Sequence, residues 1–264
     1  MRLTEQNYFS REAQMEYMSA SQYKAFLECP AAAMAEIRGE YTRKETKALT
    51  LGSYMDALFS NNTAWLLDHD SELHNSRTGE LKAEFRAAQA AALRVREDKL
   101  FMRYVSGQPQ VIRTGEIGGV PFKIKMDSYH PGKAIVDLKY MRDFETSYSP
   151  TEEKRVNFAY SWGYDIQGAI YQAIEGNGLP FFIAGITKQD PPDFEVLNIN
   201  QQRLDQQLHN IRILAPVYQQ MKCGEVQATR CGKCAYCRAT KKLTHVWDVE
   251  DYDAGGSANG THCF

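Results

Sequence analysis

Three charged side chains near the middle of the chain could form a metal-dependent catalytic centre. Asp127 precedes the segment Pro131-Gly132-Lys133, and Asp137 and Lys139 follow that segment. If residues 131–133 form a three-residue hairpin loop with Gly132 in the left-handed conformation, Asp127 lies opposite Asp137. Opposed Cβ atoms lie about 5 Å apart, and Lys139 points to the same side. The sequence therefore predicts a site for Mg²⁺ or Mn²⁺ beside an amine that could orient or deprotonate water.

The charges on this predicted hairpin form like pairs. Asp127 would oppose Asp137, and Lys139 would oppose Lys125, so each pair is repulsive unless a ligand lies between its members. A divalent cation and a phosphate would relieve both repulsions. A solvated strand with incidental charges is the alternative interpretation of Asp-x-Lys alone, and the facing Asp127 counts against it. The alternate positions are expected to form one buried face: Phe122, Ile124, Met126, Val136 and Leu138.

Four of the six cysteines could hold a second metal centre. Cys231, Cys234 and Cys237 have the two-residue spacing of cysteines that bind three irons of a 4Fe-4S cluster. Cys29 can supply the missing fourth thiolate. Four thiolates also suit tetrahedral Zn²⁺, and reduced unligated thiols are a third alternative, but the compact triple favours the iron-sulfur cluster. The remaining two cysteines, Cys223 and Cys263, lack matching spacing.

The segments around these residues indicate an α+β fold. Ser19-Ala20-Ser21-Gln22 matches a capping box that begins the first helix. Helical spacing of apolar residues dominates the first hundred residues, and alternating apolar residues then indicate a β meander. Further helices are expected over residues 47–60, 80–104, 161–175 and 201–221, and strands over 110–117, 120–129, 134–140, 181–188 and 194–199.

Changes of pattern divide the chain into three parts. Residues 1–18 are expected to form an irregular arm, residues 19–247 one domain, and residues 248–264 a flexible tail. Within the domain, residues 19–105 are mainly helical, residues 106–222 carry the aspartates, and residues 223–247 are rich in cysteine.

Composition limits where the protein acts and how it contacts a polyanion. The 264 residues are 43% hydrophobic, which suffices for a substantial core. The apolar runs are shorter than the roughly 20 residues of a membrane span, and the start is too polar for a signal peptide, so a cytoplasmic protein is expected. The net charge of −2 leaves DNA contact to local basic residues. The candidates are Lys123, Lys125, Lys188, Arg238, Lys241 and Lys242.

The order of these motifs resembles that of the PD-(D/E)xK nuclease superfamily. Met126-Asp127 followed by Asp137-Leu138-Lys139 is similar to its second and third motifs, with Met126 in place of the usual proline. Gln167 and Tyr171, four residues apart on one helix face, resemble the Gln/Tyr motif of the RecB-like branch.

Two further positions match the family less closely. Residues 51–58 resemble its early helix, with Asp56 where a His often stands, and Glu116 matches an additional acidic position. The division of the cysteines between the two ends of the chain is similar to that in iron-sulfur nucleases such as AddB.

The resemblance implies a restriction-endonuclease-like α/β/α core with a helical N-terminal elaboration. It implies that Asp127, Asp137 and Lys139 are catalytic and that Gln167 and Tyr171 contact DNA or support Lys139. The metal ligands would be the two aspartates with Glu116 and Asp56, and the four cysteines Cys29, Cys231, Cys234 and Cys237 would hold the cluster.

Within the superfamily, the pattern is most similar to the prophage exonuclease VIII (RecE) group. That group implies digestion of duplex DNA from an end, leaving single strand for a RecT-like annealing protein in phage recombination. The alternatives are a structure-specific or endonucleolytic DNase, a non-catalytic DNA-binding relative, and an iron-sulfur redox protein. Strand polarity and oligomeric state, including a homo-oligomer, stay open.

Overall fold

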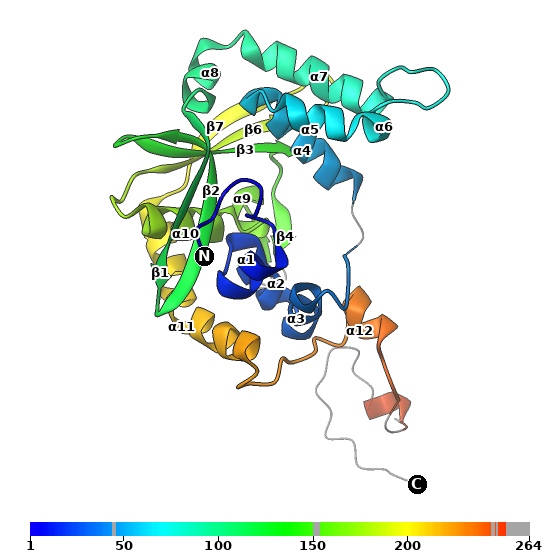
Figure 1. Cartoon of the computed structure of the whole chain (residues 1–264), viewed down its shortest axis with the longest axis vertical. Helices are drawn as coiled ribbons and strands as arrows, with labels where there is room; N and C mark the ends of the chain where they lie inside the picture. Colours follow the sequence, from blue (N-terminus) through cyan, green and yellow to red (C-terminus); the bar gives the residue numbers. More distant parts are fainter. Residues whose placement is uncertain (44–45, 150–153, 244–245, 247, 252–264) are drawn as a thin grey trace.

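The computed structural model describes residues 1–43, 46–149, 154–243, 246 and 248–251. Its centre is a five-stranded sheet in the order β1-β2-β3-β6-β7 (Figure 1). Neighbouring strands are antiparallel except β3 and β6, which are parallel. The strands are β1 (Gln108–Ile117), β2 (Val120–His130), β3 (Ala134–Met141), β6 (Phe181–Thr187) and β7 (Phe194–Asn198). A separate antiparallel pair is formed by β4 (Ser147–Ser149) and β5 (Lys154–Val156).

Helices cover both faces of the sheet (Figure 1). One face packs against α2 (Ala20–Glu28), α3 (Pro30–Arg38), α9 (Phe158–Ser161), α10 (Tyr164–Glu175) and α11 (Gln201–Cys223). The other packs against α4 (Lys47–Ser60), α5 (Thr63–Asp68), α6 (Asp70–Leu73), α7 (Ala83–Arg96) and α8 (Lys99–Val105). The shorter elements are α1 (Arg11–Glu16), α12 (Ala235–Ala239) and the 3-10 helix η1 (Val249–Asp251).

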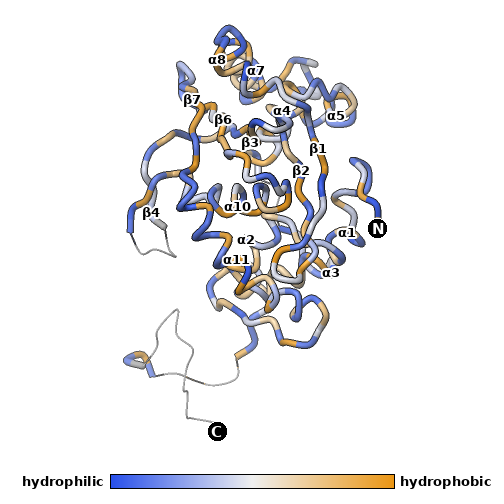
Figure 2. Tube along the Cα trace, turned by 90° about the vertical axis from the view of Figure 1, so that its left-hand side faces the viewer, coloured by the Kyte–Doolittle hydropathy of each residue, from blue (hydrophilic) through white to orange (hydrophobic). Residues whose placement is uncertain are grey.

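Each face has its own core because successive side chains of a strand point to opposite sides. Ile135 and Phe181 belong to the core against α10 and α11, whereas their neighbours Val136 and Phe182 pack into the core against α7 and α8. In Figure 2 the most hydrophobic segments lie along the central strands, between the two helical layers. The mixed sheet flanked by helices confirms the expected fold class.

The register predicted for the hairpin of β2 and β3 is confirmed at its closed end. Ser128 pairs with Val136 and His130 pairs with Ala134, and Gly132 has a φ of 68°. The ladder stops there. Asp127 and Asp137 are not a cross-strand pair, because a carboxylate oxygen of Asp127 accepts a hydrogen bond from the backbone N–H of Leu138 at 3.0 Å.

The expectation of a single buried hairpin face is wrong. Met126 packs in the core against α10, whereas Val136 and Leu138 pack in the core against α4 and α7. Met126 and Tyr129, three residues apart, share one core, so the alternation of β2 slips at Asp127 and Ser128. The physical reason is that helices bury both faces of β3, so neither face of the hairpin is left to solvent.

Capping residues and one glycine determine where several of the helices begin and end. Ser19 accepts a hydrogen bond from the N–H of Gln22 and begins α2 as predicted. The single helix expected over residues 80–104 is two helices, because Asp98 caps a new one by accepting from the N–H of Phe101. Gly163, with a φ of 64°, likewise separates α9 from α10.

The first 18 residues are more ordered than expected. Ser10 caps α1 by accepting from the N–H of Ala13. Two buried lysines hold the segment through its carbonyl groups: Lys123 donates to Tyr8 O and Lys222 donates to Tyr17 O. Of the expected tail, residues 252–264 lie outside the described residues. Among the helices that the structure describes, none is long and apolar enough to span a bilayer.

Candidate active site

The residues predicted to be catalytic line one cavity of about 560 Å³. It opens where β2 and β3 separate, and α4, α10 and the first residues of the chain complete its wall. The five residues Asp127, Asp137, Lys139, Gln167 and Tyr171 all line it, as does Asp56. The structure therefore brings these side chains together as the sequence predicted, while their catalytic roles stay predictions.

Asp137 is the most enclosed of the carboxylates. Its side chain is buried, and one oxygen accepts a hydrogen bond from Gln167 Nε2 at 2.7 Å. The other oxygen lies 2.5 Å from Lys139 Nζ and forms a buried ion pair with it. Gln167 thus supports Asp137 rather than Lys139. A buried carboxylate that lines the cavity together with Asp56 and Asp127 is suited to bind a metal ion.

Asp127 and Asp56 form the rest of the acidic cluster. Burial raises the pKa of Asp127 well above its ordinary value, and the carboxylates of Asp56 and Asp137 raise it further. Burial also raises the pKa of Asp56, against the opposing effect of Lys139. Burial lowers the pKa of Lys139, but Asp137 and Asp127 outweigh it and hold that pKa above its ordinary value. Three carboxylates gather around Lys139, with Lys24 and Lys125 also close enough to act on Asp137 and Asp56, and a divalent cation would relieve the repulsion among the carboxylates.

Replacing Asp127 with Asn is expected to stabilise the metal-free protein at neutral pH. A carboxyl whose pKa is raised by folding destabilises the folded state once pH exceeds its unfolded pKa. Burial and the charges of Asp56 and Asp137 raise the pKa of Asp127, so removing its charge is expected to raise the Tm. The gain should disappear near pH 4, where the unfolded carboxyl is half protonated.

The measurement is thermal unfolding with and without Mn²⁺. Addition of Mn²⁺ should raise the Tm of the wild-type protein and not that of Asp127→Asn, because the variant lacks a ligand. An equal response of both proteins to Mn²⁺ would show that Asp127 holds no ion.

Tyr164 and Tyr171 are two further residues of α10 that line the cavity. The Tyr171 hydroxyl donates to the backbone oxygen of Lys125 at 2.9 Å, so it holds the β2 strand beside the acidic cluster. Lys139 Nζ lies 5.4 Å from the centre of the Tyr164 ring. Tyr164 was not anticipated from the sequence, although it lies three residues before Gln167 and thus on the same face of the helix.

Glu116 does not belong to this cluster. It is exposed and pairs with Pro121 next to the turn between β1 and β2. Along β1 it is six residues from Gln110, which lies beside Asp127. Six residues of a strand span about 20 Å. The expectation that Glu116 completes the metal site is therefore wrong. Its position in the sequence matched the motif, but the length of β1 places it far from the other carboxylates.

Gln110 is a residue of the site that the sequence did not reveal. Its φ of 53° is left-handed, and its place opposite Asp127 is missing from the β1–β2 ladder. Its side-chain amide lies 3.4 Å from Asp127 and also interacts with Asp56, where it lowers the pKa. A bulky residue held at positive φ beside two carboxylates indicates strain kept for positioning.

Gln110→Gly is expected to raise the Tm while lowering the activity predicted for this site about tenfold or more. Glycine adopts a positive φ without strain, so the Tm should rise. Loss of the Gln110 amide removes the group that orients Asp56 and Asp127. Residues that support metal ligands typically contribute 10–100-fold to metal affinity or activity. Asn61, which ends α4 with a φ of 54°, provides the matched control. Asn61→Gly should relieve similar strain and leave activity unchanged. Unchanged activity in Gln110→Gly would assign Gln110 a purely structural role.

The N-terminal segment contributes two side chains that were also not predicted. Tyr8 is buried, and both burial and the charge of Asp127 raise its pKa, so its hydroxyl lies within reach of the acidic cluster. Phe9 lines the same cavity and is largely exposed. Lys24 on α2 approaches from below α10, where burial and the charge of Lys139 lower its pKa to about 8. Residues 1–18 were expected to be irregular, so their sequence did not indicate that Tyr8 and Phe9 reach the cavity.

The basic residues predicted to contact DNA have different environments. Lys125 and Lys188 line the cavity. Lys123 is buried and donates to Tyr8 O, so its expected role in DNA contact is wrong. The other three, Arg238, Lys241 and Lys242, lie in the C-terminal segment after the cysteines, and Arg238 donates to the backbone oxygen of Lys233.

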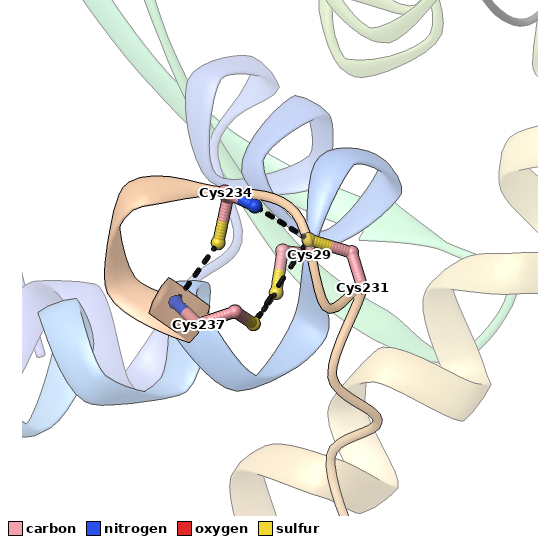
Figure 3. Close-up of side chains that lie close together, drawn as sticks. All are labelled: Cys29, Cys231, Cys234 and Cys237. Carbon is pink, nitrogen blue, oxygen red and sulfur yellow. Dashed lines mark hydrogen bonds between the residues drawn. The ribbon is translucent and has the colours of Figure 1, made fainter. Parts of the chain in front are cut away.

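The four cysteines predicted to share a metal meet at one point (Figure 3). Cys29 lies between α2 and α3, whereas Cys231, Cys234 and Cys237 come from the loop and first turn around α12. All four sulfur atoms lie within 4.8 Å of one another. Backbone N–H groups point at two of them, from Cys234 to Cys231 Sγ at 3.3 Å and from Cys237 to Cys234 Sγ at 3.4 Å.

The spacing of the sulfur atoms tests which centre the cysteines fit. Four thiolates at about 2.3 Å from a single tetrahedral ion lie roughly 3.8 Å apart. In a 4Fe-4S cluster each thiolate binds a different iron, so the sulfurs must lie farther apart than around one ion. The shortest separations here are 3.6 Å between Cys29 and Cys237 and 4.0 Å between Cys231 and Cys237. The donor set fits a metal centre, and its spacing favours a single ion.

Comparison with known proteins identifies a matching family and a closely related solved structure. Residues 19–240 match the family described as "PDDEXK-like domain of unknown function (DUF3799)". A crystal structure from Eubacterium rectale, described as a "Putative exonuclease", is 40% identical and superposes with a TM-score of 0.89. The match covers 95% of this chain and 98% of that chain. No curated protein matches the sequence.

Proposed function

Since this chain belongs to the PDDEXK-like family DUF3799, we propose that it is a metal-dependent deoxyribonuclease that digests duplex DNA from an end. The observation that carries the proposal is the gathering of Asp56, Asp127, Asp137 and Lys139 around one cavity, with Asp137 buried beside Lys139. The related Eubacterium rectale structure, described as a "Putative exonuclease", supports attack from an end.

The carboxylates are proposed to hold Mg²⁺ or Mn²⁺, which prefer hard oxygen ligands. When bound, such an ion supplies positive charge to the scissile phosphate and lowers the pKa of a water molecule. Gln167 fixes the orientation of Asp137 through its 2.7 Å hydrogen bond. Because the neighbouring carboxylates keep Lys139 protonated, its ammonium group is suited to orient the attacking water and to neutralise the phosphate.

The cysteines are proposed to hold a structural metal that joins the two ends of the domain. It would tie the α2–α3 junction to the segment around α12, on the opposite side of α2 and α3 from the sheet (Figure 1). We propose Zn²⁺ on the basis of the sulfur spacing, with a 4Fe-4S cluster of the AddB type as the alternative.

By resemblance to the exonuclease VIII group, the strand left behind is proposed as the substrate of a RecT-like annealing protein in phage recombination. The cavity offers no observation on that partner.

End-labelled digestion tests the proposed activity. Purified protein with Mg²⁺ should release label from 5′-labelled linear duplex and leave a closed circular duplex intact. Cleavage of circles would show an endonuclease, and release from 3′ ends alone would contradict the exonuclease VIII-like polarity. Absence of any cleavage with Mg²⁺ or Mn²⁺ would identify a non-catalytic DNA-binding relative. Lys139→Met serves as the inactive control.

A further inference from the structure

Two large aromatic rings at the candidate active site are exposed to solvent. In the part of the chain that the structure describes, the strongly exposed aromatic side chains are Phe9 (67% exposed), Tyr148 (58%) and Trp162 (62%). Phe9 and Trp162 both line the cavity that contains Asp137 and Lys139, whereas Tyr148 does not. Leaving a large ring in water forfeits roughly 1.5–3 kcal/mol of burial, so two such rings beside one cavity indicate a ligand.

Phe9 is held in place by the buried anchors of the N-terminal segment. Its ring packs edge-to-face on buried Tyr8 with 5.0 Å between centroids. The Tyr8 carbonyl accepts from Lys123, and the Phe9 carbonyl accepts from Gln14 Nε2 at 2.9 Å. Since both neighbouring carbonyl groups are fixed, the exposed face of Phe9 is a preformed surface.

Trp162 is presented by a sharp turn between α9 and α10. Its carbonyl accepts from Lys24 Nζ at 3.2 Å, and Gly163 follows at a φ of 64°. A Cβ at Gly163 would lie 2.8 Å from Lys24 Cδ, and the positive φ disfavours any larger residue at this turn. Trp162 is therefore fixed from a different element than Phe9, and both rings line the same cavity.

The charge of the cavity identifies the class of ligand. Lys125, Arg142 and Lys188 line it together with the two rings, and Lys125 Nζ lies 5.0 Å from the centroid of Phe9. Exposed rings combined with cations are the arrangement by which proteins bind single-stranded nucleic acid: bases stack on the rings while phosphates meet the cations. In a duplex each internal base is already stacked on its neighbours, so beyond the outer face of the last pair, side-chain rings can engage only bases that are unpaired.

We propose that Phe9 and Trp162 stack on unpaired bases of the strand that enters the cavity, so that the enzyme acts on a DNA end whose last base pairs have opened. This inference rests on the proposed nuclease function and names the form of DNA that the site binds. Terminal pairs that are already mismatched should bypass the opening step.

Steady-state digestion of a blunt duplex provides the first test. Phe9→Ala and Trp162→Ala should each raise the KM about tenfold with little change in kcat, since stacking on one base contributes about that much. Phe9→Tyr should retain the wild-type KM because it keeps a ring, whereas Phe9→Leu should not. Tyr148→Ala is the matched control, an exposed ring away from the cavity, and should behave as wild type. A mismatched end should lower the KM of the wild-type protein.

Binding measured without catalysis separates this inference from the proposed function. In a Lys139→Met background, a single-stranded oligonucleotide should quench Trp162 fluorescence, and Phe9→Ala should weaken its binding about tenfold. If wild-type protein digests DNA while both alanine variants keep wild-type KM and binding, the stacking proposal is overturned and the nuclease function stands. If no DNA is digested but binding depends on the two rings, the rings bind single strand and the nuclease function fails.

Discussion

Asp137→Asn and Lys139→Met should each lower the rate of DNA digestion by roughly 10³-fold or more. An ion positioned at a phosphate contributes several kcal/mol of transition-state stabilisation, and each 1.36 kcal/mol is a factor of ten in rate. Asp137→Asn removes the buried carboxylate charge, and Lys139→Met removes the cation 2.5 Å from it while keeping most of the side-chain volume. Initial rates on linear duplex at saturating Mg²⁺ measure both effects.

Matched controls distinguish loss of chemistry from loss of structure. Glu116→Gln removes an exposed carboxylate from the neighbouring strand β1, and Lys133→Met removes an exposed amine from the turn between β2 and β3. Both should retain wild-type rates, and circular dichroism should show all four variants folded. A folded Asp137→Asn or Lys139→Met with full activity would remove these residues from the catalytic centre.

Loss of the cysteine centre is expected to have the largest effect on stability. Cys29→Ser should lower the Tm by roughly 10 °C, because a link between Cys29 and the three C-terminal cysteines closes a loop of about two hundred residues. Links across loops of that size contribute about 4 kcal/mol or more, and each kcal/mol corresponds to about 2–4 °C. Thermal unfolding and elemental analysis of the purified protein measure the loss of stability and of metal together.

Purified protein also allows a control variant to be compared and the metal to be identified. Cys223, an exposed free thiol at the end of α11, should tolerate serine without change in Tm or metal content. One equivalent of zinc in colourless protein would support the single-ion site, whereas four irons with absorbance near ~400 nm would establish the iron-sulfur cluster. Wild-type protein free of metal, with a Tm equal to that of Cys29→Ser, would show that the thiols hold nothing.

The sequence predicted the closed end of the hairpin because it depends on short-range rules, whereas the grouping of Asp56, Gln167 and Tyr171 with the hairpin followed from the resemblance of the motif order. Gly132 fixes the turn, and the turn fixes the register of the last pairs. The separation of the strands beyond Ser128 could not be predicted in this way. There Asp127 accepts from the N–H of Leu138, and helices bury the second face of β3.

The other differences between prediction and structure arise from contacts between residues that are far apart in the sequence. Glu116 matched a motif by order along the chain, but order does not measure the distance along a strand. Tyr8 and Phe9 precede the first strong helical pattern, and only the tertiary contacts of Lys123 bring them to the cavity. Cys29 and Cys237 were correctly associated because the chemistry of thiolates, rather than local pattern, required a fourth ligand.

The two buried lysines that hold the N-terminal segment have a consequence for handling the protein. Truncation before Ser19 would strip Lys123 of the Tyr8 carbonyl and Lys222 of the Tyr17 carbonyl, leaving the Lys222 ammonium with the Gln22 side chain as its remaining acceptor. Burying an uncompensated charge is strongly unfavourable, so trimming this segment would damage the enzyme far from the cut. Affinity tags and cleavage sites therefore belong at the other terminus.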